Sequence, residues 1–231
     1  MERTPIIRPG FFSVNAAADS RRYEFDAKNE VVVHNGVQVD AVFLGDSITH
    51  AWELNAYFGG RNRIVLNRGI GGDKSGFLAR RFMADCIQLK PRMAVVLIGI
   101  NDTWIMDDIG APGNKVDEVA AVVMGNWTEL IEQAKQHGQT LLLCSLLPTD
   151  ISKNATNRER NEMIARLNRE LERQAQESGS VYVDYHSAMV GEDGVTLREG
   201  LAHDGLHPHV QGYNLMAEVL RSTAAGHGIT I

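Results

Sequence analysis

Four short groups of residues in this 231-residue chain combine reactive side chains with glycine, and they are the first candidates for chemistry. They are Gly45-Asp46-Ser47, Gly69-Ile70-Gly71-Gly72-Asp73, Gly99-Ile100-Asn101-Asp102 and His203-Asp204-Gly205-Leu206-His207-Pro208. A serine hydroxyl is a weak nucleophile until a neighbouring base removes its proton, and histidine is the most common base. These residue types therefore indicate acyl transfer through a serine.

A triad of Ser47, Asp204 and His207 is the interpretation that unites the first and last groups. Ser47 follows a predicted strand and opens a predicted helix, so its hydroxyl would lie near the positive end of the helix dipole; a simple helix cap is the alternative. Asp204 lies three residues before His207. Because Gly205 permits a turn between them, the carboxylate would reach the imidazole Nδ1–H. The alternative there is a surface histidine with a chance acidic neighbour.

The two middle groups offer hydrogen-bond donors for an oxyanion. The backbone N–H of Gly72 and the side-chain amide of Asn101 would join the N–H of Ser47. The alternatives are a tight turn at Gly72 and an Asx turn at Asn101. The segment over 185–202, with three acidic residues, is expected to cover the site as a polar lid. Substrate contacts are expected close to the serine and the asparagine, although a tryptophan there fits a core position equally well; the candidates are Asp46, Trp52 and Trp104.

The elements that must position these residues begin with five runs rich in Val, Ile and Leu, which are predicted to be strands. They are Asp40–Leu44, Arg63–Asn67, Met93–Ile98, Thr140–Ser145 and Val181–Asp184. The runs are continuously apolar, which is typical of strands covered on both faces in a parallel sheet. Ligands bind at the carboxyl ends of such strands, and the first three groups directly follow one.

Segments with a helical period lie between the predicted strands. They cover about 73–86, 115–137, 156–179 and the residues from 210 onward. Thr156 and Glu159 have the spacing of a capping box at the start of the third segment. The alternation of strand and helix predicts an α/β fold, a three-layer α/β/α sandwich with a parallel sheet and right-handed crossovers.

The first 39 residues do not follow this alternation. We expect an N-terminal arm followed by a helix over 20–33, both packed on a single domain that spans 40–231. The chain shows no internal repeat, linker or low-complexity stretch.

Composition limits the partners. Lys and Arg number 23 against 29 for Asp and Glu, a net charge of −6, which argues against nucleic acid or anionic membrane as a partner. No window approaches the ~20 apolar residues of a membrane span, and no secretory signal is seen at the start, so a cytoplasmic location is expected. The two cysteines, Cys86 and Cys144, stand in apolar periodic segments and are expected to be buried free thiols.

The four groups, in this order, resemble the sequence blocks of the SGNH hydrolases, also called GDSL esterases and lipases, and within them the catalytic subunits of platelet-activating-factor acetylhydrolase. The resemblance covers about residues 40–222. It implies a flavodoxin-like sandwich with five parallel strands, no cofactor and no metal, and it admits a homodimer. By resemblance, Ser47 is the nucleophile, His207 its base and Asp204 the residue that orients the base. The oxyanion hole implied by the resemblance consists of Ser47, Gly72 and Asn101.

The expected activity is therefore that of a serine esterase acting on a small-molecule ester with a short acyl group, chiefly acetyl, on a carbohydrate; a phospholipid-type acetyl ester is the second substrate. A classical α/β-hydrolase is disfavoured because Thr49 stands where its G-x-S-x-G motif ends in glycine. Two alternatives remain: a binding protein that has lost the chemistry, and a metal site. The ligands of that metal site would be His203, Asp204, His207 and His209.

Overall fold

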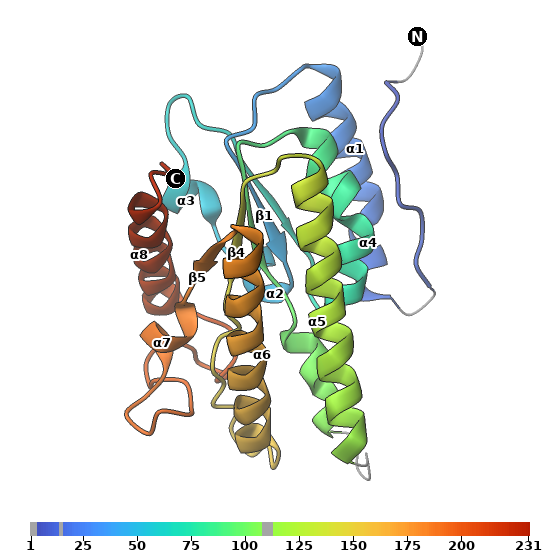
Figure 1. The fold of residues 1–231 in the computed structure, drawn as a ribbon. Helices are drawn as coiled ribbons and strands as arrows, with labels where there is room; N and C mark the ends of the chain where they lie inside the picture. Colours follow the sequence, from blue (N-terminus) through green and yellow to red (C-terminus); the bar gives the residue numbers. More distant parts are fainter. Residues whose placement is uncertain (1–3, 14–15, 108–112) are drawn as a thin grey trace.

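The computed structural model describes residues 4–13, 16–107 and 113–231, and in them a five-stranded parallel sheet lies between two layers of helices (Figure 1). The strands are β1 Ala41–Gly45, β2 Val65–Gly69, β3 Met93–Leu97, β4 Leu141–Cys144 and β5 Val181–Val183. Their order in the sheet is β2-β1-β3-β4-β5, the flavodoxin-like order. The predicted α/β/α sandwich is confirmed, and its topological switch point lies between β1 and β3.

The strands form where apolar runs were found. Every residue of β1, β3 and β4 is buried, as expected for strands covered on both faces. The edge strand β2 begins at Val65, two residues later than predicted, because Arg63 forms an isolated antiparallel bridge with Gly60 instead. It continues to Gly69, which pairs with Gly45 at the end of β1.

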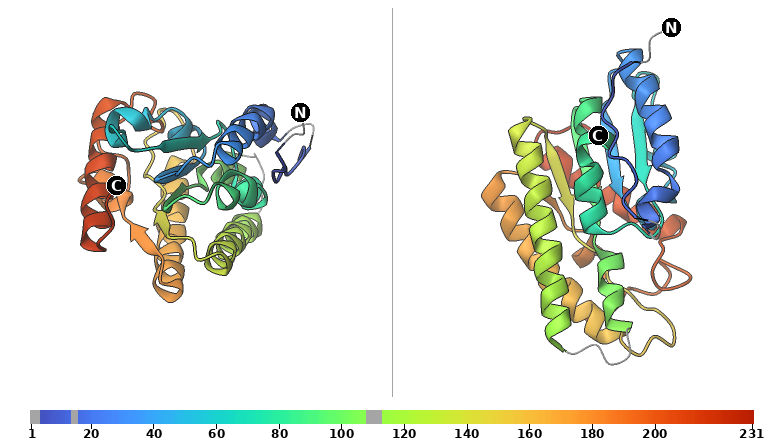
Figure 2. Two further views of the ribbon diagram at one scale, coloured as in Figure 1. Left: turned by 90° about the horizontal axis from the view of Figure 1, so that it is seen from above. Right: turned by 90° about the vertical axis from the view of Figure 1, so that its right-hand side faces the viewer.

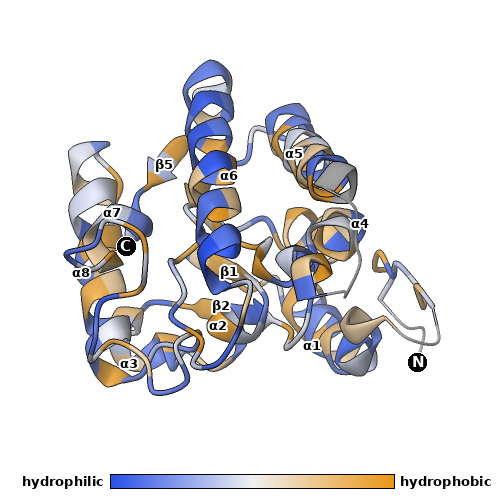
Figure 3. Cartoon of the chain, turned by 90° about the horizontal axis from the view of Figure 1, so that it is seen from below, coloured by the Kyte–Doolittle hydropathy of each residue, from blue (hydrophilic) through white to orange (hydrophobic). Residues whose placement is uncertain are grey.

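Helices cover both faces of the sheet. On one face α1, α4, α5 and α6 lie side by side, whereas α3 and α8 cover the other face (Figure 2). Seen from below, α6 is largely hydrophilic (Figure 3), so that only a narrow stripe of it reaches the core. The helical elements are η1 Ala17–Ser20, α1 Arg22–His34, α2 Ser47–His50, α3 Leu54–Phe58, α4 Ser75–Asp85, η2 Ile87–Leu89, η3 Ile100–Asp107, α5 Gly113–Gln136, α6 Asn157–Ser178, α7 Tyr185–Met189 and α8 Val210–Gly226.

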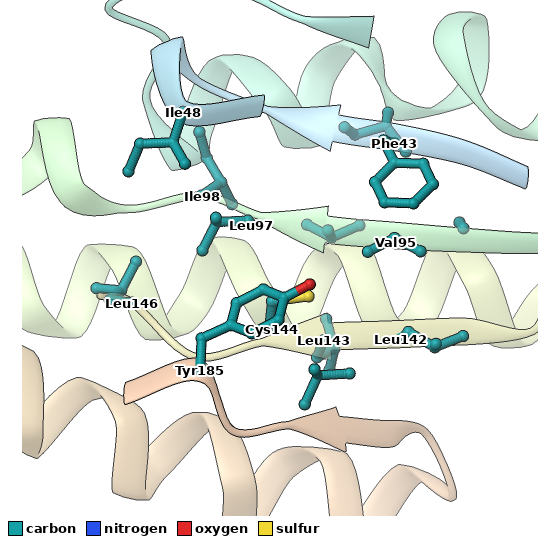
Figure 4. Packing of buried hydrophobic residues seen from close by; sticks show 14 of the residues in the cluster. Phe43, Ile48, Val95, Leu97, Ile98, Leu142, Leu143, Cys144, Leu146 and Tyr185 are labelled. Atoms are coloured by element: carbon teal, nitrogen blue, oxygen red, sulfur yellow. The ribbon is translucent and has the colours of Figure 1, made fainter. Parts of the chain in front are cut away.

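The main hydrophobic core is built on the strands. Side chains of neighbouring strands pack against one another, and the Cys144 thiol lies among them beside Tyr185 (Figure 4). Both cysteines are buried and free, as predicted. A second, smaller cluster joins Ala18, Phe25 and Ile70, so it connects the N-terminal helices to the loop after β2. No helix in the described part of the chain is both long and apolar enough to cross a membrane.

The sequence expectation about the start of α6 is wrong. Thr156 does precede α6, but its side chain makes no capping hydrogen bond to that helix; its hydroxyl donates to Asn154 Oδ1 (2.8 Å) instead. The segment over 185–202, expected to cover the site as a polar lid, begins with α7. It is fixed by side chains that are at most 6% exposed, although its acidic residues remain exposed. The buried side chains are Tyr185, Met189, Leu197 and Leu201.

The helix expected near the N-terminus is present as α1, and it packs against α4 and η2. The preceding arm runs alongside, with the Phe12 ring stacked on Phe77 at 5.6 Å between centroids. Residues 1–3 and 14–15 of the expected arm lie outside the described residues.

Candidate active site

The predicted site residues meet at one edge of the sheet. Because β1 lies between β2 and β3, the segments that follow these three strands are neighbours. Gly45 is in register with Gly69 of β2 and with Leu97 of β3. Ser47 stands two residues beyond that register line, Gly72 three and Asn101 four. The topology therefore gathers the first three sequence groups at the switch point, where α/β folds bind ligands.

The structure joins Ser47, His207 and Asp204 by two hydrogen bonds. Ser47 Oγ lies 2.8 Å from His207 Nε2. The other ring nitrogen, Nδ1, lies 2.6 Å from Asp204 Oδ2. With the proton on Nδ1, the imidazole donates to the carboxylate and leaves Nε2 free to accept from the serine. This is the arrangement needed for a serine to lose its proton as it attacks.

The Asp204 carboxylate is fixed by the backbone of its own loop, residues 203–208, here called the His207 loop. Its Oδ1 accepts from the N–H groups of Leu206 (2.9 Å) and His207 (2.7 Å). Partial burial favours the neutral acid, but the hydrogen bonds from His207 and Leu206 prevail and lower the pKa of Asp204 to about 2. Asp204 is therefore ionised at neutral pH and favours the imidazole with its proton on Nδ1.

Gly205 lets this loop pack tightly on the loop after β4. Its φ of +76° belongs to the left-handed region, and a Cβ there would lie 1.8 Å from the Asp150 carbonyl oxygen. That close approach allows the Asp150 N–H to donate to the Gly205 carbonyl at 2.8 Å. Only glycine fits between the two loops at this position.

Asp46 is not a substrate contact, contrary to expectation. It is fully buried, and its Oδ1 accepts from the Ile48 N–H at 3.0 Å, which caps α2 directly beside the serine. Its Oδ2 has no hydrogen-bond partner among the described residues. Burial raises the pKa of Asp46 to about 7, and the nearby carboxylates of Asp73 and Asp102 add to the increase. Its role is to begin the helix that presents the serine.

Two of the three predicted oxyanion donors are backbone N–H groups. Ser47 opens α2, so its N–H has no acceptor within the helix. Among the described residues no acceptor pairs with the Gly72 N–H, and the φ of +76° at Gly72 belongs to a turn after β2. The N–H groups of both residues are therefore available to a ligand.

Asn101 is held in one orientation from two sides. One Nδ2 hydrogen is donated to the Asp73 carbonyl (2.9 Å), next to Gly72. Its Oδ1 accepts from Trp104 Nε1 (2.9 Å), and the Arg160 guanidinium lies 4.3 Å above the Trp104 ring. The second Nδ2 hydrogen is left for a ligand. Sequence reasoning missed this support because it depends on α6 packing against η3.

The two tryptophans proposed for substrate contact have different environments. Trp52 is only 3% exposed and stacks on Tyr213 at 5.2 Å, so its assignment to the mouth of the site is wrong. It lies in the aromatic core between α3 and α8. Trp104 is partly exposed and remains a candidate for substrate contact in addition to holding Asn101.

A buried arginine beneath the site was also missed. Arg81 of α4 donates to the carbonyl oxygens of Arg68 (2.9 Å) and Gly45 (3.2 Å), and to the Asp73 carboxylate (2.9 Å). It thereby joins the ends of β1 and β2 to the loop that carries Gly72. Its position on a helix gave no signal, since an arginine there usually faces solvent.

The histidine cluster near the C-terminus is organised differently from a metal centre. Both ring nitrogens of His207 are engaged, one with serine and one with aspartate. The rings of His203 and His209 lie against each other at 4.4 Å between centroids. Within the described residues, no group of three or more His, Cys, Asp and Glu side chains is placed to hold a metal ion.

Comparison with known proteins gives consistent results. Residues 43–215 match the model of the GDSL-like Lipase/Acylhydrolase family. An acetylxylan esterase from Geobacillus stearothermophilus is 29% identical over 156 residues, which are 66% of this chain and 68% of the esterase. A crystal structure of a presumed acylhydrolase from Bacteroides fragilis superposes with a TM-score of 0.73 at 28% identity, covering 91% of this chain and 97% of that one. A GDSL-like lipase from Bacteroides thetaiotaomicron gives 0.72 at 26% identity, covering 91% and 99%.

The fold and these matches define a carboxylic ester hydrolase. The chain belongs to the GDSL-like lipase/acylhydrolase family, the SGNH hydrolases, as its four sequence groups suggested.

Proposed function

We propose that the protein is a serine esterase in which Ser47 attacks the ester carbonyl and His207 acts as the base. The observation that carries the proposal is the 2.8 Å contact between Ser47 Oγ and His207 Nε2, with Asp204 on the other ring nitrogen. As the serine oxygen bonds to the carbonyl carbon, its proton moves to Nε2. The imidazolium formed is stabilised by the Asp204 carboxylate.

The remaining steps use the same groups in reverse order. The negative oxygen of the tetrahedral intermediate accepts hydrogen bonds from the N–H groups of Ser47 and Gly72 and from the Asn101 amide. When the intermediate collapses, the bond to the alcohol breaks and His207 returns its proton to the leaving oxygen. Water then gives a proton to His207 as its oxygen bonds to the acyl carbon. The bond from that carbon to Ser47 Oγ breaks, His207 returns the proton to Oγ, and the acid leaves.

The proposed substrate is an acetyl ester on a carbohydrate. The acetylxylan esterase relative supports this choice. The Trp104 ring supports it too, because it is partly exposed beside the firmly held Asn101 side chain, and an aromatic ring is a suitable surface for a sugar face. A phospholipid-type acetyl ester is the competing substrate and is distinguished by the assay.

The test compares turnover of p-nitrophenyl esters of increasing chain length, acetylated xylo-oligosaccharides and an acetyl glycerophospholipid. We expect acetyl esters to be preferred over longer acyl groups, and the acetylated sugar to exceed the phospholipid in kcat/KM. Preference for long acyl chains would contradict the substrate assignment.

The mechanism is tested separately with Ser47→Ala and with a fluorophosphonate probe followed by peptide mapping. The variant is expected to lose turnover and labelling while keeping its circular dichroism spectrum. Ser187→Ala is a matched control, because Ser187 also follows a strand in an aspartate-capped short helix but has no histidine partner in the described structure. Near wild-type kcat in Ser47→Ala would overturn the mechanism.

A further inference from the structure

Residues 17–25 lie before the part of the chain that matches the family, residues 43–215, yet they contact the loop proposed to carry the oxyanion-hole glycine. This loop, residues 69–73, follows β2 and is here called the β2 loop. We propose that Arg21 is a positioning residue for the oxyanion hole, and that residues 17–25 are part of the catalytic apparatus. The inference rests on the proposed function, because it assumes that the Gly72 N–H receives the oxyanion.

Arg21 binds the β2 loop directly. Its guanidinium donates one N–H to the Gly69 carbonyl at 2.9 Å, at the point where β2 ends and the loop begins. The other donors form a fork with both oxygens of Glu24, at 3.0 and 2.9 Å. The guanidinium also lies 4.8 Å above the Phe25 ring. An arginine held by a fork and a ring has one orientation, so the donor to Gly69 is fixed before substrate arrives.

The electrostatics of the ion pair between Arg21 and Glu24 agree with this geometry. Hydrogen bonds from Arg21 and then Lys28 lower the pKa of Glu24 to about 2, against the effect of burial. Glu24 therefore stays ionised throughout the neutral range. The fork on Arg21 is then charge-assisted, and such bonds are about twice as strong as neutral ones.

Apolar contacts from the same segment hold the rest of the β2 loop. Ile70 is fully buried against Ala18 and Phe25 in the small second cluster. The Ala17 methyl carbon lies only 3.1 Å from where a Cβ on Gly72 would be. The segment therefore packs closely on the loop, and the left-handed φ of +76° at Gly72 also favours glycine there.

These contacts matter because an oxyanion hole works by preorganisation. The gain in rate comes from donors that already point at the developing charge. A small displacement of the Gly72 N–H therefore reduces the stabilisation of the transition state more than the binding of the substrate. Within the loop, Gly72 has no hydrogen bond of its own among the described residues. Its position must therefore be set by its neighbours, of which Gly69 and Ile70 are held by the N-terminal segment.

The test uses the chain over residues 1–231 with Arg21→Met, which keeps an unbranched apolar stem but removes the donors, and with Arg21→Lys, which restores a donor. We expect kcat to fall about 10-fold in Arg21→Met, less than the roughly 10²- to 10³-fold typical of losing a donor outright, with KM within about twofold. Arg21→Lys should recover part of the loss. Both are compared with Arg8→Met, which removes the Arg8–Glu30 ion pair of the same N-terminal region but does not touch the β2 loop.

A second readout separates positioning from general loss of structure. An aryl trifluoromethyl ketone forms a tetrahedral oxyanion with the active serine, so its Ki should rise in Arg21→Met by the same factor as kcat/KM falls. A competitive product alcohol, which carries no oxyanion, should bind unchanged. Arg21→Met with wild-type kcat and Ki, or an equal loss in Arg8→Met, would overturn the inference. Ser47→Ala in the same assays separates the two claims: if it stays active, the proposed function fails, whereas an inactive Ser47→Ala with an unaffected Arg21→Met refutes the role of Arg21 alone.

Discussion

The Asp204 carboxylate is fixed by three hydrogen bonds that all come from Leu206 and His207. They lower its pKa to about 2, so the carboxylate takes up a proton only as the pH falls toward that value. The charge that orients His207 is thus present throughout the range in which an imidazole titrates. Protonation of Asp204 should therefore not contribute to a loss of activity in mild acid.

We therefore predict a single-proton acid limb in the pH profile. The proposed mechanism needs a neutral imidazole, because only that form accepts a proton from serine. The measurement is kcat/KM against pH, and the expected slope of the logarithmic plot is one. A flat profile would exclude His207 as the base, and a slope of two would show that Asp204 or another group titrates with it.

Asp46 titrates in the opposite sense, because burial raises its pKa to about 7. Between about pH 4, where an unfolded aspartate ionises, and pH 7, the folded chain retains a proton that the unfolded chain releases. The free energy of unfolding therefore decreases over this interval. The cost is complete above the raised pKa.

Replacing Asp46 with asparagine should remove this cost. Asp46→Asn keeps an oxygen acceptor for the Ile48 N–H, so we expect it to be more stable than the wild type by roughly 2–4 kcal/mol at pH 8, with the difference vanishing near pH 4. Urea unfolding at both values measures it. Asp184→Asn is the control, since Asp184 caps α7 in the same way but is only partly buried.

At the scale of elements, the loops at the sheet edge support one another. Gly205 is the point of contact between the His207 loop and the loop after β4. Gly205→Ala should lower the free energy of unfolding by about 3 kcal/mol or more and displace His207, since Cβ would overlap a carbonyl oxygen. Gly200→Ala is the matched control: its φ of +81° is equally left-handed but no atom lies within 4 Å of the added Cβ, so about 1 kcal/mol is expected.

The helix η3 contributes through Trp104, whose Nε1 holds the Asn101 oxygen. Trp104→Phe keeps a ring for Arg160 to cover but removes one of the two hydrogen bonds that orient the amide. We expect kcat to fall about 10-fold with little change in KM for p-nitrophenyl acetate. Trp52→Phe is the matched control, because Trp52 Nε1 has no partner among the described residues; equal losses in both variants would contradict the role of Trp104.

The five strands and the longer helices were predictable from sequence to within a few residues, because continuous apolar runs and helical periods are local signals. Gly45, Ser47 and Asn101 could be assigned to one edge because parallel strands end at the same edge. Trp52 was assigned wrongly, since a spacing of five residues from the serine does not tell which way a side chain turns. The roles of Arg21 and Arg81 depend on contacts between distant segments, which no local pattern contains.

At the scale of the whole molecule, the core encloses both thiols. Burial raises the pKa of Cys144 to about 12 and also raises that of Cys86. We predict that the native protein does not react with a disulfide reagent at neutral pH, whereas two thiols react in concentrated guanidinium chloride. Labelling followed over time then measures opening of the core. Rapid modification of the native enzyme would contradict the burial of the cysteines.

His207 lies 160 residues after Ser47 in the sequence. The helix α8 follows His207, and its Tyr213 hydroxyl donates to the Ile48 carbonyl of the serine helix at 2.8 Å. The ribosome therefore adds the serine 160 residues before the histidine that is proposed to be its base. A growing chain therefore carries Ser47 before His207 is added, and we expect it not to hydrolyse esters until then. We expect esterase activity to begin only after α8 has left the ribosome, because the contact between Tyr213 and Ile48 places this helix against the serine helix.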